Sequence, residues 1–365
     1  MKHKSKSGIL AEKAYIKVKN IRRIQSVRKN AKKRLEILNG GYVGKKGEFE
    51  NTVLEYWKPY GIKPQKYWYQ IYCDGKGGFD PRYIPDDMME EKIYPYFNNI
   101  LWGRAYADKC GYDKLFPNLI RPKTIAKNSC GRYYDGNQNV ISREQAIQLC
   151  LKEERFIVKC ATFSSGGRDI IVFEKGEVNE NAVRKFFKEY GMNFIVQELV
   201  TQHDDLAKLN ASSLNTLRIQ TFYFKGKVHI LSAQIRIGSG GARVDNYSSG
   251  GYACDVQPDG RLNERAVSKA QGWATVHPNG FAFKDVVVPG YDEIIKVVKR
   301  EAAQLPQLNI IGWDFAVGKN GEPVFIELNI TPETNQNGSG PTFGDLTEAV
   351  LKDVFIDKTL GDAFL

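Results

Sequence analysis

Apolar and polar positions follow different periods along this chain, and each period predicts its own kind of element. Over the first 40 residues apolar side chains recur at spacings of three and four, which predicts one long amphipathic helix that ends near Asn39-Gly40-Gly41. Between residues 42 and 106 aromatic residues crowd together among frequent Pro and Gly, so we expect short helices around a small core rather than a carbohydrate-stacking surface. The apolar stripe of the long helix consists of Leu10, Ala14, Val18, Ile21, Ile24, Val27, Ala31, Leu35 and Leu38.

From about residue 107 helical and strand patterns alternate. The predicted helices span 108–116, 143–154 with Ser142 as its N-cap, 181–190 and 291–305. The predicted strands span 120–125, 156–159, 170–174, 194–200, 217–224, 228–237 and the two halves of a hairpin over 310–330, while 238–290 is expected to be a loop region. Mixed strands with segregated helices indicate an α+β fold rather than a doubly wound parallel sheet.

The basic charge of the chain is confined to its first segment. The net charge is +11, but residues 1–40 hold 13 of the 53 lysines and arginines and 2 of the 42 acidic residues, so the remainder of the chain is neutral. A solvated helix packed on the body, an interfacial helix on anionic lipid and an RNA-binding segment all fit such a composition. Only Tyr15 offers a ring for base stacking there, which disfavours nucleic acid as the partner.

Neither a membrane span nor a secretory signal is expected. No apolar run approaches the roughly 18–20 residues of a transmembrane helix, and the N-terminus lacks the apolar segment of a signal peptide. The six cysteines form no CxxC pair, which is typical of a reducing compartment and argues against a zinc site. The sequence therefore predicts a cytoplasmic protein, with peripheral contact at the inner face of the membrane through residues 1–40 as an open alternative.

Two carboxylates and an amide are predicted to meet on the 310–330 hairpin. Asn320-Gly321 favours a two-residue type I′ turn, which places Asp314 directly across from Glu327, with Asn329 on the same face. Adjacent carboxylates repel unless a cation lies between them, and hard oxygen ligands suit a Mg²⁺ ion that also binds a nucleotide's phosphates. The alternative is an ordinary exposed hairpin face. The apolar neighbours of the set are expected to be Trp313, Phe315, Phe325 and Ile326.

A lysine and a flexible loop suggest a place for phosphates. The strand 156–159 ends in Lys159, and the Ser/Gly-rich loop 164–167 follows within a few residues. Backbone N–H groups of such a loop can approach phosphate oxygens closely, while the lysine supplies positive charge. The chain has neither the P-loop motif nor the dinucleotide-binding GxGxxG motif. Taken alone, a plain hairpin turn explains the feature equally well.

The strand 194–200 carries a polar pair that suits an adenine. Its apolar run is interrupted by Gln197 and Glu198, and Glu198 would lie near the exocyclic amine of the base. His203 or Asp204, a few residues further on, could reach the ribose. On composition alone this segment also fits an ordinary strand.

The order and spacing of these elements resemble the ATP-grasp superfamily over residues 105–345, roughly two thirds of the chain. The resemblance implies two α+β lobes that clasp ATP and a Mg²⁺ ion held by Asp314, Glu327 and Asn329. It divides the chain into a basic helix (1–40), an aromatic-rich domain (41–121), a lid lobe (122–200) and a C-terminal lobe with the metal site (201–352). The residues that match nucleotide contacts of the superfamily are Lys109, Lys159, Ser165, Gly166, Gly167, Gln197, Glu198 and Val200.

Several short motifs carry a narrower resemblance. They are Gln202-His203, Leu214-Asn215-Thr216-Leu217-Arg218, Arg236-x-Gly238, Asp245-Asn246-Tyr247-Ser248-Ser249-Gly250-Gly251, His277-Pro278, Pro289-Gly290-Tyr291 and Gly312-Trp313-Asp314. They resemble the sugar-transfer-associated ATP-grasp group, whose members are linked with capsule, O-antigen and other surface-polysaccharide pathways. The part from Arg236 to Gly251 is also similar to ribosomal-protein glutamate ligases and tubulin ligases. The lid loop departs from the glycine-richer pattern of the superfamily.

ATP-grasp ligases activate a carboxylate as an acyl phosphate, which an amine then attacks. The resemblance therefore implies an ATP- and Mg²⁺-dependent carboxylate–amine ligase that joins an amino acid and a sugar unit in surface-polysaccharide synthesis. Arg218 and Arg236 are expected to bind the γ-phosphate and the acceptor carboxylate, in an order that the sequence leaves open. Asn246 is expected to bind the acyl phosphate or a metal-bound water. A kinase of the same fold that acts on a sugar-like hydroxyl and a non-catalytic membrane or RNA adaptor are the alternatives.

Overall fold

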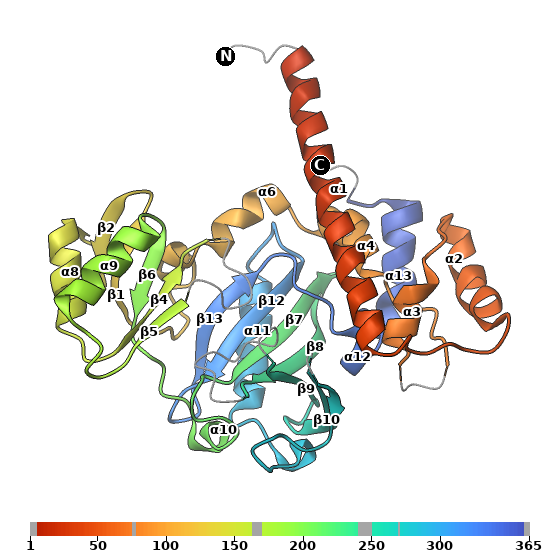
Figure 1. The fold of residues 1–365 in the computed structure, drawn as a ribbon. Coiled ribbons are helices and arrows are strands. Elements are labelled where there is room, and N and C mark those ends of the chain that lie inside the picture. Colours follow the sequence, from red (N-terminus) through yellow and green to blue (C-terminus); the bar gives the residue numbers. More distant parts are fainter. Residues whose placement is uncertain (1–5, 75–77, 163–169, 240–249, 269–270, 361–365) are drawn as a thin grey trace. The chain divides into compact units, whose positions relative to one another are not determined.

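The computed structural model describes residues 6–74, 78–162, 170–239, 250–268 and 271–360. The chain divides into two compact units, of which unit 1 comprises Met1–Asn99 with Glu333–Leu365 and unit 2 comprises Ile100–Pro332. Figure 1 labels the elements of both. The boundaries of these two units differ from those of the four segments expected from the sequence. The four-segment division therefore stays a prediction.

Unit 1 contains one long helix, α1 (Lys6–Ile37), which ends close to the predicted stop. Over residues 21–38, Ala31 is buried, and Ile24, Val27, Leu35 and Leu38 are half-buried. This half of α1 packs against short helices of the same unit. An ion pair of 2.7 Å between Arg28 Nε and Asp87 Oδ2 adds to the contact. The amphipathic pattern is thus confirmed from Ile24 onward, whereas Ile21 of the predicted stripe is 46% exposed.

The aromatic residues of unit 1 form its core, as expected. Trp57, Tyr69, Tyr72 and Phe97 are at most 1% exposed. The C-terminal residues complete the unit, because the Gln336 carboxamide donates to the Ile84 carbonyl at 2.6 Å and accepts from the Ile84 N–H at 2.9 Å. Helices of this unit are η1 (Glu50–Leu54), α2 (Glu55–Trp57), η2 (Lys58–Tyr60), α3 (Lys66–Tyr72), α4 (Asp86–Met88), η3 (Met89–Ile93), α5 (Tyr94–Phe97), α12 (Gln336–Ser339), η8 (Gly344–Leu346), α13 (Thr347–Lys352) and η9 (Asp353–Asp357).

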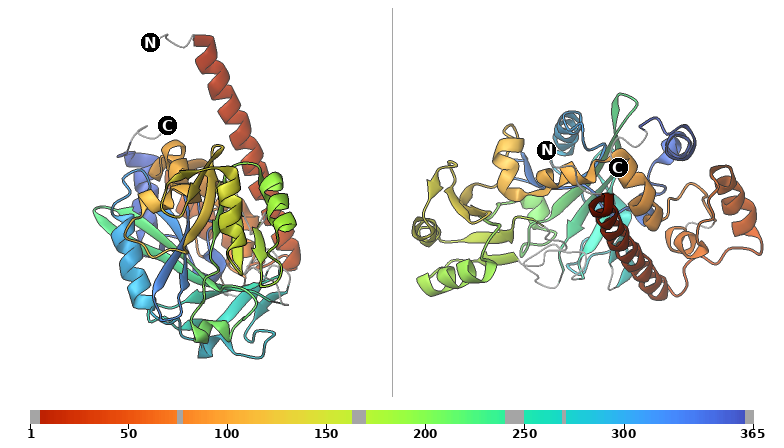
Figure 2. Two further views of the ribbon diagram at one scale, coloured as in Figure 1. Left: turned by 90° about the vertical axis from the view of Figure 1, so that its left-hand side faces the viewer. Right: turned by 90° about the horizontal axis from the view of Figure 1, so that it is seen from above.

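Unit 2 begins with an antiparallel sheet in the order β3-β2-β1-β6-β4-β5. Helices α8 (Arg143–Leu151) and α9 (Glu180–Tyr190) lie side by side on one face of it (Figure 1 and Figure 2). The predicted Ser142 N-cap is confirmed, and Gln145 completes a capping box. The strands are β1 (Thr124–Ser129), β2 (Arg132–Asp135), β3 (Val140–Ile141), β4 (Phe156–Cys160), β5 (Ile170–Phe173) and β6 (Phe194–Gln197), of which β2 and β3 are not predicted by the sequence pattern.

The two faces of this sheet differ in character. Phe156 and Val158 of β4 point into the core beneath the helices, together with Phe194 and Val196 of β6. Because side chains alternate along a strand, Lys159 lies on the opposite face. We call this six-stranded sheet the lid sheet, and its face opposite α8 and α9, on which Lys159 lies, the inner face.

The second sheet of unit 2 has the order β11-β10-β9-β8-β7-β12-β13 and is also antiparallel. Helix α11 (Tyr291–Ala302) packs on its apolar face. The expectation that 238–290 is a loop region is wrong, since it contains β9, β10 and β11. The buried strand β9 shows no polar alternation, and a bulge interrupts the pairing of β10 with β9. The strands are β7 (Thr216–Phe224), β8 (Lys227–Ile237), β9 (Tyr252–Val256), β10 (Leu262–Ser268), β11 (Gly272–Ala274), β12 (Ile310–Val317) and β13 (Pro323–Asn329).

The β12–β13 hairpin pairs Asp314 with Glu327, as predicted, although the predicted turn is wrong. Gly318 N donates to Glu322 O at 2.8 Å, which leaves a three-residue loop, and within that loop only Gly321 has a positive φ, of 86°. The longer loop shifts the pairing by one position. A β-bulge at Ile326 shifts it back, because Phe315 pairs with Phe325 while Asp314 pairs with Glu327.

The bulge also decides which side chains share a face. Without it, Phe325 and Glu327 would point the same way. With it, Phe325 joins the buried core beneath α11, while Glu327 lies on the opposite face with Asp314. The expectation that aromatic side chains surround the carboxylates is therefore wrong, since Trp313 and Phe315 also lie in that core.

This assignment of faces predicts unequal effects of two neighbouring truncations. Phe325→Ala should lower the free energy of unfolding by about 3–5 kcal/mol, because it empties a core site, whereas Ile326→Ala at the half-buried bulge should lower it by about 1 kcal/mol. Urea denaturation followed by far-UV circular dichroism gives both values. Equal losses, or a larger loss for Ile326→Ala, would contradict the bulge.

Candidate active site

The polar face of the second sheet holds a buried carboxylate between two arginines. Asp314 of β12 is 3% exposed and lies directly across from Arg218 of β7. Arg218 donates through both Nε and NH2, the latter to Oδ2 at 2.9 Å, and Arg236 NH2 of β8 donates to Oδ1 at 2.6 Å. Burial by itself raises the pKa of the Asp314 carboxyl, but the two guanidinium groups outweigh it and hold that pKa well below its usual range.

Glu327 has a cation of its own. Lys109 Nζ lies 3.0 Å from Glu327 Oε2, and the lysine is 8% exposed. Lys109 opens the short helix η5 (Lys109–Gly111), which leads directly into α7 (Tyr112–Leu115). The Tyr112 hydroxyl accepts from the N–H of Leu328 at 3.0 Å, so the same turn also contacts the backbone of β13.

Asn329 completes the polar set. It follows Glu327 by two residues, and its Nδ2 is a buried atom with no hydrogen-bond partner among the residues that the structure describes. A buried amide nitrogen without a partner is unusual, since such groups are almost always satisfied by protein, water or a bound ligand. Asp314, Glu327 and Asn329 are thus brought together on one face, as the sequence predicts.

These three residues have the chemistry of a Mg²⁺ site. They offer carboxylate and amide oxygens, the hard ligands that Mg²⁺ prefers, and Mg²⁺ takes its other ligands from water and phosphate. Within the described ranges, no group of three or more His, Cys, Asp or Glu side chains could hold a metal ion. The remaining ligands of an ion at this hairpin would be water or the phosphate oxygens of a nucleotide. The residue types fit the metal, while in this structure both Asp314 oxygens accept from Arg218 and Arg236 and Glu327 pairs with Lys109.

Lys159 lies near the end of β4, on the inner face of the lid sheet. Its Cα pairs with Ile170 of β5 and Ile195 of β6, and the side chain is 9% exposed. The predicted loop residues Ser165, Gly166 and Gly167, and also Asn246, lie outside the described residues.

The polar pair at the end of β6 contacts the segment before β1. Gln197 Nε2 donates to the carbonyl of Pro122 at 3.3 Å. Glu198 is exposed, and its carboxylate accepts from the N–H of Lys123 at 2.9 Å. Glu198 also donates its own N–H to the Lys123 carbonyl at 3.0 Å, and Val200 is half-buried. The described Glu198 side chain thus fastens β6 to a neighbouring segment.

His203 has a local structural task. Its Nδ1 accepts from the N–H of Asp205 at 3.2 Å and so caps helix α10 (Asp204–Ala207). Its backbone N–H donates to the Val317 carbonyl at 3.0 Å, which places it at the end of β12.

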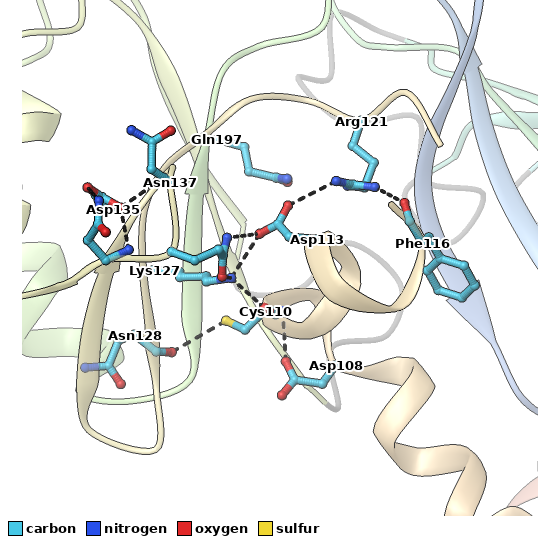
Figure 3. Close-up of polar contacts among 12 residues, drawn as sticks. Asp108, Cys110, Asp113, Phe116, Arg121, Lys127, Asn128, Asp135, Asn137 and Gln197 are labelled. Atoms are coloured by element: carbon cyan, nitrogen blue, oxygen red, sulfur yellow. Dashed lines mark hydrogen bonds and ion pairs between the residues drawn. The ribbon is translucent and has the colours of Figure 1, made fainter. Parts of the chain in front are cut away.

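A buried lysine on the lid sheet is absent from the sequence-based set of site residues. Lys127 of β1 is 3% exposed and belongs to a network with Asp113, Cys110 and Gln138, part of which Figure 3 shows. The available signal was a lysine inside an apolar strand, Thr124-Ile125-Ala126-Lys127, where a charged side chain needs partners.

Among the described helices none is long and apolar enough to cross a lipid bilayer.

No curated protein sequence matches the chain significantly. The biotin carboxylase domain of Hydrogenobacter thermophilus 2-oxoglutarate carboxylase, crystallised with MgADP, is 11% identical with a TM-score of 0.44 over 70% of this chain and 47% of that chain. The ADP-bound N5-carboxyaminoimidazole synthetase from Staphylococcus aureus is 10% identical, with a TM-score of 0.39 over 65% of this chain and 50% of that chain. The L-amino acid ligase from Bacillus licheniformis is 13% identical, with a TM-score of 0.34 over 71% of this chain and 48% of that chain.

The chain thus spans about half the length of these three structures. A family model described as sugar-transfer associated ATP-grasp matches residues 106–340, which is more than half of the chain. That match includes both sheets of unit 2 and the hairpin with Asp314, Glu327 and Asn329. The chain belongs to the sugar-transfer associated ATP-grasp family.

Proposed function

We propose that this protein is an ATP- and Mg²⁺-dependent ligase that joins a carboxylate to an amine. The observation that carries the proposal is the opposed pair of Asp314 and Glu327, held among Arg218, Arg236 and Lys109 on one face of the second sheet. Two acids and three cations, of which Lys109 comes from η5, suit a site that handles anionic phosphates and an anionic acceptor. Neither an enzyme nucleophile nor a redox group is needed for such a reaction.

The chemical difficulty lies in the approach of two anions. An acceptor carboxylate oxygen must attack the γ-phosphorus of ATP while ADP leaves, which gives an acyl phosphate. Asp314, Glu327 and Asn329 would hold Mg²⁺, which neutralises phosphate charge when it is bound. Lys109 and Lys159 would contact the phosphates, and Arg218 and Arg236 would orient the γ-phosphate and the carboxylate through bidentate contacts.

The second half of the reaction releases phosphate. The amine nitrogen attacks the acyl carbon, loses a proton and expels inorganic phosphate, so that the products are an amide, ADP and phosphate. Asn246 would bind the acyl phosphate, and Ser165, Gly166 and Gly167 would cover the phosphates. Gln197, Glu198 and Val200 would line the adenine, with His203 at the ribose.

The family description supports a place in sugar chemistry. A sugar-transfer associated ATP-grasp family implies substrates that carry sugars, so we assign the ligase to surface-polysaccharide synthesis, where it would join an amino acid and a sugar unit. A uronic acid or an amino acid would supply the carboxylate, and an amino sugar or an amino acid would supply the amine.

The metal assignment is tested at Glu327, which pairs with Lys109, because Asp314 pairs with two partly buried arginines. Glu327→Gln keeps the shape but removes the charge, so ATP turnover should fall by on the order of 10²–10³. The Mg²⁺ concentration needed for half-maximal ADP binding, measured by calorimetry, should rise. Glu322→Gln at the turn of the same hairpin is the matched control and should leave both unchanged. Normal Mg²⁺ dependence in Glu327→Gln would remove the metal assignment.

The ligase is distinguished from a kinase by its intermediate. Hydroxylamine added to a mixture of ATP, Mg²⁺ and a panel of amino acids and uronic acids should convert an acyl phosphate to a hydroxamate, which mass spectrometry detects. A phosphorylated hydroxyl with no hydroxamate would show the kinase instead. No ADP release with any acceptor, together with no ATP binding, would favour the adaptor.

We further propose that the first 20 residues contact anionic lipid. They hold six lysines and one glutamate, whereas residues 21–38 of α1 already pack on unit 1. Each lysine near an anionic surface contributes about 1 kcal/mol, so deletion of residues 1–20 should weaken binding to phosphatidylserine vesicles at least about tenfold. Vesicles of neutral lipid serve as the control in a sedimentation assay. Equal sedimentation of both chains would exclude this contact.

A further inference from the structure

Lys127 occupies a site that uses all of its hydrogen-bonding capacity. Its Nζ donates to the Cys110 carbonyl at 2.7 Å, to Asp113 Oδ2 at 2.9 Å and to Gln138 Oε1 at 2.7 Å. An ammonium group has three N–H donors, and here each has an acceptor from the chain itself. With 3% exposure, this lysine is not available to a ligand.

Lys127 lies across one strand from Lys159, the lysine that we assign to the nucleotide phosphates. Lys127 on β1 and Lys159 on β4 both pair with Ile195 of the strand between them, so the two lysines flank Ile195 on the inner face of the lid sheet. From sequence or register alone either lysine could be taken for a phosphate-binding group. The network of Lys127 shows that its ammonium instead faces the turn that carries Lys109.

That turn is clamped from two further directions. Asp113 Oδ2 also accepts from Gln138 Nε2 at 2.7 Å, and Asp113 Oδ1 accepts from Arg121 NH2 at 3.4 Å. On the other side, Arg121 Nη1 donates to the carbonyl of Phe116 (Figure 3) and to the carbonyl of Leu119 at 3.1 Å. Gln138 itself has a φ of 69°, a left-handed conformation that is strained for a residue with a side chain. Strain of that kind persists where surrounding contacts hold it in place.

The clamped turn contacts both sheets of unit 2. The N–H of Lys109 donates to the carbonyl of Ala161 at 3.0 Å, just beyond β4, while its Nζ reaches Glu327 on β13. Cys110 Sγ lies 3.6 Å from the carbonyl of Phe194 on β6, and Tyr112 bonds to the backbone of Leu328. Elements as short as η5 and α7 are not stable by themselves, so these outside contacts decide where the turn lies.

We propose that Lys127 is the positioning residue for Lys109. Through the Cys110 carbonyl and Asp113 it fixes the turn that holds the Lys109 ammonium against Glu327. Because this turn contacts both the lid sheet and the β12–β13 hairpin, it would hold Lys159 and the proposed metal ligands in a fixed position around the nucleotide phosphates. The inference rests on the proposed function in that Lys109 is taken to contact the nucleotide.

A double-mutant cycle tests whether Lys127 acts through Lys109. The chains are the wild type, Lys127→Met, Lys109→Met and the double variant, each as the full-length protein, and the measured quantity is the dissociation constant of MgADP by calorimetry. Each single change should weaken binding about 10–100-fold, the range for residues that orient a ligand-binding group. The double variant should bind no more weakly than Lys109→Met, because the two residues share one path.

Two outcomes overturn the inference alone. If the losses multiply in the double variant, Lys127 acts independently of Lys109. If Lys127→Met lowers the melting temperature but binds MgADP normally, its role is structural. Normal binding by Lys109→Met is a different result, since it removes the nucleotide role of Lys109 on which both this inference and the proposed function depend.

Two further variants make the test robust. Lys127→Met leaves the Asp113 carboxylate without its nearest cation, a change that lowers stability wherever the pair is shielded from water. Where that lowers the yield of folded protein, Asp113→Asn carries the same cycle with Lys109→Met, because it keeps the side-chain shape and weakens the clamp. Lys175→Met is the matched control: it removes an exposed lysine of the same lobe, 3.1 Å from Glu154, and should leave MgADP affinity unchanged.

Discussion

The polar face of the second sheet depends on one buried acid, Asp314, and its two guanidinium partners. A carboxylate removed from water is stable as an anion only if opposite charge and hydrogen bonds replace the lost solvation. Arg218 and Arg236 supply both from the next two strands. Because a slip of one residue between β7 and β12 would turn Arg218 to the apolar side, this contact also selects the register of the central strands.

The hairpin that carries Glu327 illustrates how sequence reasoning can reach a correct pairing through an incorrect turn. Asn320-Gly321 has the composition of a two-residue turn, and the pairing of Asp314 with Glu327 agrees with it. The loop nevertheless has three residues, and the extra position is absorbed at Ile326. Local composition does not reveal such a bulge, because its cause is tertiary: Phe325 and Leu328 both have to enter the core beneath α11.

The other elements also separate into those with a local sequence pattern, which can be predicted, and those that depend on tertiary contacts, which cannot. Helices α8, α9 and α11 and strands β4, β6, β7, β8, β12 and β13 follow from periodicity and end signals, because each has a regular apolar pattern or a cap. Strand β9 does not, since Tyr252-Ala253-Cys254-Asp255-Val256 is buried on both faces. Lys127 was missed for a similar reason: its acceptors come from Cys110, Asp113 and Gln138, which no local pattern connects with β1.

The assembly of unit 1 from both ends of the chain has a consequence for biosynthesis. Residues of unit 2 are contiguous, so a nascent chain can complete both of its sheets before the last helices emerge from the ribosome. Unit 1 has to wait, because Gln336 supplies the partner for Ile84 and Asp353 the acceptor for the Tyr96 hydroxyl at 2.7 Å. Its aromatic residues, made before those of unit 2, are therefore covered only after unit 2 has been synthesised, and during translation they stay exposed longer than the core of unit 2.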